Sequence, residues 1–146
     1  MNMLSSLKRL ALCSAVLGAG LAVATPASAA DGNIVKSNLS GKWQIALGGY
    51  TGCGNHALMM TVTLDANAAG TNGTLVSHGS CGDGTQTNQT FTVSQLAASG
   101  SGTANMSCGP GCGWNFKIQV APDRSTFNLV DVTDPNNFLV GTAVRQ

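Results

Sequence analysis

The chain has 146 residues, of which 43% are hydrophobic and only 9% are charged, and its formal net charge is +1. It contains no glutamate and no cluster of basic residues, which disfavours nucleic acid as a partner and a pair of glutamates as a catalytic device. Its 19 glycines, together with abundant Thr, Ser and Asn, favour a protein of strands and turns.

Residues 1–30 are typical of a secretory signal peptide. Lys8 and Arg9 provide the positive start, and residues 10–23 form an apolar run that is too short to span a bilayer. Small residues after this run predict cleavage near Ala29 or Ala30. We therefore expect a secreted or periplasmic protein.

The mature part, residues 31–146, is expected to form one domain that begins with a short polar arm, residues 31–38. Five basic and six acidic side chains give this part a net charge of −1. About 116 residues suffice for one domain that buries roughly two thirds of the surface of its unfolded chain. We expect no membrane span once the signal is removed.

Alternation of apolar and polar residues recurs between glycine-rich breaks, and no stretch keeps helical spacing over three turns. On the clearest segment, Trp114, Phe116, Ile118 and Val120 share one face. Eight strands are predicted: Gly41–Leu47, Leu58–Leu64, Gly73–His78, Thr90–Leu96, Thr103–Cys108, Trp114–Val120, Ser125–Val132 and Phe138–Arg145. Their short connections favour an all-β, eight-stranded antiparallel up-and-down barrel, and a two-sheet β-sandwich is the alternative.

The mature chain contains four cysteines: Cys53, Cys81, Cys108 and Cys112. In an up-and-down barrel the loops after odd-numbered strands lie at one end, and all four cysteines fall in such loops. Four cysteines in an oxidising compartment favour two disulfides, whereas the paired short spacing of zinc sites is absent. Three pairings are possible. We favour Cys53 with Cys81 and Cys108 with Cys112, because Gly109-Pro110-Gly111 forms a tight turn between the second pair.

The segment Gly41-Lys42-Trp43 resembles the Gly-x-Trp opening of calycin barrels, the superfamily of lipocalins, avidins and a bacterial metalloprotease inhibitor. Gly113-Trp114 is similar to a strand of avidins. The resemblance implies that Trp43 closes the barrel floor and that Arg145 stacks on its indole ring. The residues after Trp43 lack the Asn and Ser that avidins use for biotin. The inhibitor branch also has a disulfide between the loops after strands one and three, and an inserted amino-terminal arm.

Five residues are candidates for contact with a ligand: Trp43, Tyr50, His56, His78 and Trp114. The tryptophans suit stacking on an aromatic ligand, since an eight-stranded barrel can leave room for one small molecule. The histidines flank the cysteine loops, where we expect solvated side chains and not metal ligands. Ser80 lacks the surrounding sequence of a nucleophile elbow, so no catalytic residue is assigned.

The sequence thus predicts an exported, non-enzymatic binding protein that recognises a small apolar or aromatic ligand, or a protein surface, at a disulfide-stapled barrel rim. One alternative is an inhibitor of an exported protease, such as a metalloprotease, with residues 31–38 as the inserted arm. In that case deletion of the arm should abolish inhibition and leave the barrel stable. Another alternative is a structural envelope or surface protein. No cofactor and no metal are expected.

Overall fold

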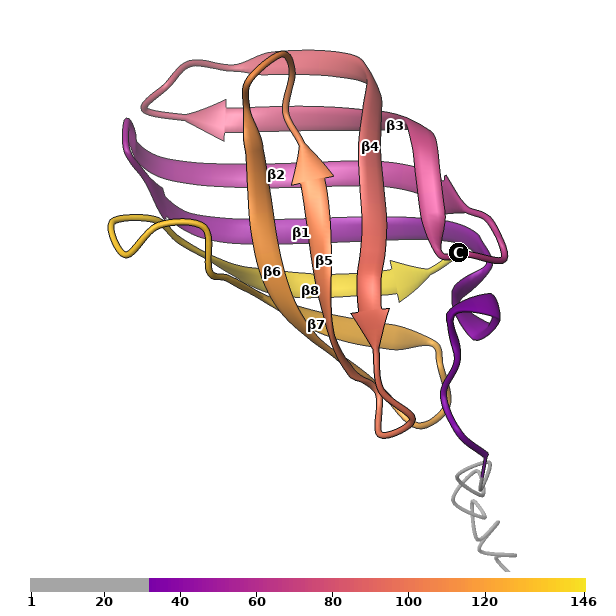
Figure 1. Ribbon diagram of the computed structural model, residues 1–146. Helices are drawn as coiled ribbons and strands as arrows, with labels where there is room; N and C mark the ends of the chain where they lie inside the picture. The colour runs from indigo at the N-terminus through magenta and orange to yellow at the C-terminus, as the bar shows by residue number, and fades with distance from the viewer. Residues whose placement is uncertain (1–31) are drawn as a thin grey trace, which may run out of the picture.

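The computed structural model describes residues 32–146, so the predicted signal peptide and its cleavage site lie outside the described residues. Eight antiparallel strands follow one another around a closed barrel, and β8 pairs with β1 (Figure 1). Their bounds are β1 Gly41–Thr51, β2 Gly54–Leu64, β3 Ala69–Gly79, β4 Gly84–Leu96, β5 Ser101–Ser107, β6 Gly113–Val120, β7 Thr126–Asp131 and β8 Phe138–Arg145. This closure confirms the up-and-down barrel and excludes the sandwich. Within residues 32–146, no helix has the length and apolar character needed to cross a membrane.

The first two strands are longer than predicted. Sequence alternation ends β1 at Leu47 and starts β2 at Leu58, whereas the observed ladder continues to a turn at Thr51–Gly54. Gly49 lies within this extension, where β8 passes so close that an added Cβ would collide with a carbonyl of β8. A glycine gives no hydrophobic signal, but its backbone still pairs. The sequence pattern therefore underestimates how far the strands reach toward the rim.

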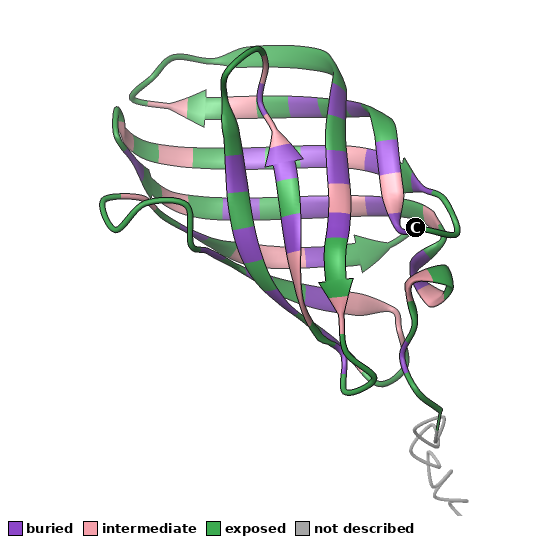
Figure 2. Ribbon diagram, in the orientation of Figure 1, coloured by how far each residue is buried: buried purple, intermediate pink, exposed green. Residues whose placement is uncertain are grey.

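The inward faces predicted for the first, second and sixth strands are confirmed. Burial alternates along the strands, as the bands in Figure 2 show. The side chains expected inside are all at most 9% exposed: Trp43, Ile45, Leu47, Leu58, Met60, Val62, Leu64, Trp114, Phe116, Ile118 and Val120. The ring of Phe127 lies 4.8 Å from Trp43 and 5.9 Å from Phe91, centroid to centroid. Aromatic side chains therefore fill the part of the barrel around Trp43.

Trp43 closes the barrel end opposite the cysteine loops, as the calycin resemblance implies. The Arg145 guanidinium carbon lies 5.0 Å from the centre of the indole ring. The indole N–H donates to the Leu39 carbonyl at 2.7 Å, and Arg145 donates to the carbonyls of Ser40 and Asn38. The short 3₁₀ helix Lys36–Leu39 is thereby fixed across the barrel floor.

The amino-terminal arm is not free. Ile34 is buried, and its backbone N–H donates to the Ala98 carbonyl at 3.0 Å. The Lys36 ammonium donates to the Ser94 carbonyl at 2.9 Å. The described part of the arm, residues 32–38, thus packs on the floor, where Ile34 is buried and Val35 remains exposed. Because of these contacts, we now expect deletion of the arm to lower barrel stability.

Candidate functional site

The two disulfides lie at the end of the barrel opposite Trp43. Cys53 and Cys81 are bonded, with Cα atoms 5.4 Å apart, and Cys108 and Cys112 are bonded, with Cα atoms 5.1 Å apart. Both predicted pairings are confirmed. The first bridge joins the β1–β2 turn to the β3–β4 loop, and the second closes the β5–β6 hairpin. Together they form the cysteine rim.

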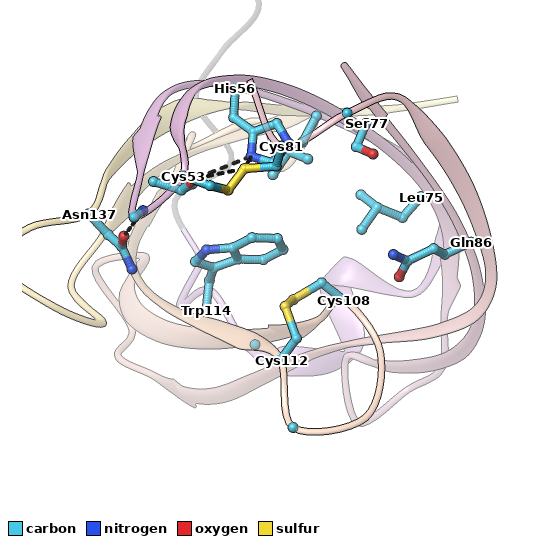
Figure 3. Close-up of a pocket in the computed structure, with 16 residues that line it drawn as sticks. Cys53, His56, Leu75, Ser77, Cys81, Gln86, Cys108, Cys112, Trp114 and Asn137 are labelled. Carbon is cyan, nitrogen blue, oxygen red and sulfur yellow. Dashed lines mark hydrogen bonds between the residues drawn. A yellow bond between two sulfur atoms is a disulfide. The ribbon is translucent and has the colours of Figure 1, made fainter. Parts of the chain in front are cut away.

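A cavity of about 620 Å³ opens at this rim. Its apolar wall consists of Leu58, Leu75 and Trp114, and polar side chains reach it from β2, β3 and β4: His56, Ser77 and Gln86. In the view into the mouth, the indole ring of Trp114 lies between the two disulfides (Figure 3). The barrel is therefore hollow at the rim and packed toward the floor. This volume lies within the range of about 300–1,000 Å³ found for small-molecule sites.

Trp114 is held in the cavity wall by the alternation of β6. Phe116, the next inward residue on that strand, is fully buried beneath it, whereas Trp114 keeps 9% of its surface exposed. Within residues 32–146, the Trp114 indole N–H has no hydrogen-bond partner, whereas the Trp43 indole N–H donates to the Leu39 carbonyl. Trp114 thus lines the cavity with its ring, and its N–H has no partner among residues 32–146.

His56 belongs to a compact polar corner beside the first disulfide. Its Nδ1 lies 3.2 Å from the Thr51 hydroxyl and 3.6 Å from Cys81 Sγ. The same hydroxyl lies 3.5 Å from Cys53 Sγ and 3.7 Å from Cys81 Sγ. Thr51 is buried because it is the last inward residue of β1. One hydroxyl therefore contacts both sulfurs and the imidazole.

Asn137 connects the loop between β7 and β8 to the rim. Its side-chain carbonyl accepts a hydrogen bond of 3.0 Å from the backbone N–H of Gly52. This contact connects the β7–β8 loop to the β1–β2 turn, and both residues line the cavity. The sequence analysis did not select Asn137, because Pro135-Asn136-Asn137 is typical of a turn.

Only His56 and Trp114 of the five candidate residues line the cavity. Trp43 is fully buried at the floor. Tyr50 and His78 point outward because each neighbours an inward residue on its strand. His78 Nδ1 lies 2.6 Å from an Asp83 carboxylate oxygen, with both side chains largely exposed. His78 lies in β3, within the predicted strand, whereas His56 lies in β2, which starts earlier than predicted.

No protein-family model matches the chain, and comparisons with curated proteins and with solved structures found no match. The likeness to calycins therefore rests on two structural features of this chain, and not on any matched protein. These are the closed eight-stranded barrel and the Trp43–Arg145 contact at its floor. The two disulfides are typical of proteins in oxidising compartments.

Proposed function

We propose that this is an exported, non-enzymatic binding protein of calycin type that holds a small apolar or aromatic ligand at its cysteine rim. The observation that supports this proposal is the cavity of about 620 Å³ whose wall includes the Trp114 ring between two disulfides. No lining residue is an Asp, Glu, Lys or Arg. A neutral ligand is favoured, because an ion transferred there would lose hydration without a charged partner.

Stacking and preorganisation supply the affinity in this proposal. An aromatic ring on Trp114 gains about 0.5–1.5 kcal/mol beyond the burial of apolar area. The disulfides already restrict the loops that surround the ligand, so less conformational entropy is lost on binding. A hydrogen-bond acceptor on the ligand would meet the free Trp114 N–H. The preferred ligand is thus flat, neutral and equipped with one acceptor.

A neutral fluorescent probe, N-phenyl-1-naphthylamine, tests the proposal. We expect one molecule to bind per barrel, with a rise in probe fluorescence and transfer of excitation energy from Trp114. Ser77→Trp should abolish binding because Ser77 lines the cavity and the new ring would fill it. Val76→Trp is the matched control, since its neighbouring side chain faces outward and is 39% exposed.

The two variants decide between a cavity site and general surface adhesion. Equal binding by both variants, or no binding by the native protein, would contradict the proposal. Trp114→Leu keeps an apolar side chain at this position and removes the ring, and we expect a loss of affinity of about tenfold. Urea unfolding of each variant checks that the barrel is intact.

A protein partner at the same rim is the second candidate. It is supported by two exposed aromatic rings, Tyr50 at 48% and Phe138 at 61%, which face each other across β1 and β8. Exposed aromatic side chains of this kind are enriched in protein interfaces. Tyr50→Ser with Phe138→Ser should weaken such a partner and leave probe binding unchanged. The inhibitor alternative gains no support from the arm, because residues 32–38 pack on the opposite end.

A further inference from the structure

We propose that reduction of the Cys53–Cys81 disulfide converts the polar corner of the rim into a zinc site. Its ligands are the two thiolates and Nδ1 of His56. The three sulfur and nitrogen atoms already lie within 4.8 Å of one another. This site requires no ligand in the cavity, although its three residues also line that cavity.

The distances in the oxidised protein suit tetrahedral coordination. With Zn–S bonds of about 2.3 Å and Zn–N bonds of about 2.0 Å, adjacent sulfur and nitrogen ligands lie about 3.6 Å apart and two sulfurs about 3.8 Å apart. The observed distance from Cys81 Sγ to His56 Nδ1 is 3.6 Å. After cleavage of the S–S bond, rotation of the Cys53 side chain must separate the two sulfurs and bring Cys53 Sγ, which lies within 4.8 Å of His56 Nδ1, to ligand spacing.

The backbone holds the ligands in place without the disulfide. His56 pairs with Gly49 of β1 and with Gly79 of β3, so its position is fixed by two ladders. Cys53 and Cys81 each lie two residues after the end of a strand that these ladders fix, β1 and β3 respectively. All three ligand residues line the cavity, so a water can complete the coordination, as in zinc sites with three protein ligands and a bound water. The buried Thr51 hydroxyl lies beside all three ligands and can hydrogen-bond that water.

The chemistry needs a dithiol reductant and a metal ion. The reductant delivers two electrons and two protons: the S–S bond breaks, two S–H bonds form, and the reductant becomes a disulfide. Zn²⁺ then displaces the two thiol protons to solvent and accepts the lone pair of His56 Nδ1. Both sulfur-bearing residues of this bridge are exposed, so a reductant can reach either of them, whereas in the second bridge only Cys112 is exposed and Cys108 is buried.

Cobalt(II) is the probe for the experiment, and the starting variant is Cys108→Ser/Cys112→Ser, which removes the other thiol pair. After reduction with a phosphine and its removal, we expect one cobalt per chain with thiolate charge-transfer bands and intense visible bands of tetrahedral Co²⁺. Stoichiometric Zn²⁺ should abolish these bands. The oxidised protein should show none.

His56→Ala should weaken cobalt binding by more than about 100-fold, since loss of an outer-shell partner alone costs about 10- to 100-fold. His78→Ala is the matched control: it lies near the same rim but points outward, and it should leave the affinity unchanged. Equal effects of the two histidine variants, or equal cobalt binding by oxidised and reduced protein, would overturn the proposal.

Folding of the reduced protein is followed by near-ultraviolet circular dichroism. If the reduced variant loses the barrel, Zn²⁺ should restore the spectrum of the oxidised protein. Failure to restore it, together with absence of the cobalt bands, also overturns the proposal. Binding of N-phenyl-1-naphthylamine to the oxidised native protein is unaffected by any of these outcomes, so the two proposals fail separately.

Discussion

Removal of the Cys53–Cys81 bridge should destabilise the barrel more than removal of the Cys108–Cys112 bridge. The first joins residues 28 positions apart, and the second joins residues 4 positions apart. A cross-link stabilises chiefly by restricting the unfolded chain, so its effect grows with the logarithm of the loop length. This model gives about 3.6 kcal/mol for the long loop and about 2 kcal/mol for the short one.

Two double variants, Cys53→Ala/Cys81→Ala and Cys108→Ala/Cys112→Ala, measure the difference because they remove the same atoms. Urea unfolding followed by tryptophan fluorescence gives the free energy of unfolding and its dependence on urea. We expect the first variant to be less stable than the second by about 1.6 kcal/mol. Its urea dependence should also be steeper, because an unfolded chain without the long cross-link exposes more surface.

Equal destabilisation, or a larger loss from the short bridge, would refute the reasoning. Such a result would mean that contacts of the sulfurs in the folded protein dominate the effect of each disulfide on stability, and not the freedom of the unfolded chain. Cys108 is the most buried of the four sulfur-bearing residues, so it is the place where such contacts would act.

Three further outcomes are expected. Ile34→Ala should lower the free energy of unfolding by about 2–5 kcal/mol and leave probe binding unchanged, because this buried residue packs at the floor; unchanged stability would show that the arm is not docked in solution. Arg145→Ala should cost about 0.5–2 kcal/mol by removing the cation from the face of Trp43, measured by urea unfolding. Hydrogen bonds from the Ser125 hydroxyl and backbone N–H lower the pKa of Asp123 below its ordinary value of 3.8. A lowered pKa favours folding above the unfolded value and loses that effect as pH falls through the folded value. Ser125→Ala should therefore raise the Asp123 pKa in an NMR titration, and an unchanged pKa would contradict the hydrogen bond from the hydroxyl.

If the alternation of apolar residues is extended beyond the predicted strand ends, it also predicts which side chains at the rim face inward. Leu58 faces inward, so the same period extended by two residues places His56 inward. Extension from Leu47 places Thr51 inward and Tyr50 outward, as observed. Extension from Leu75 places His78 outward. The sequence prediction grouped Tyr50, His56 and His78 because they lie close to the cysteines along the chain. Whether each side chain points into or out of the barrel depends instead on its position in the alternation of its strand.

The pattern of residues alone predicted eight strands, the inward faces of the first, second and sixth, and the common end of the four cysteines, and it favoured, among three possible pairings, the one that the structure has. The strands and faces follow from a period of two and short turns, which are local. Trp43 and Trp114 both face inward by that pattern, yet one seals the packed floor and the other borders an open cavity. They lie at opposite ends because Trp43 is near the start of an odd-numbered strand and Trp114 near the start of an even-numbered one. Whether the interior is filled or open at each end depends on side chains from other strands, such as Phe127 beside Trp43 and Phe91 beside Phe127. Docking of the arm and the volume at the rim were likewise decided by tertiary packing, because both depend on contacts between segments far apart in the chain.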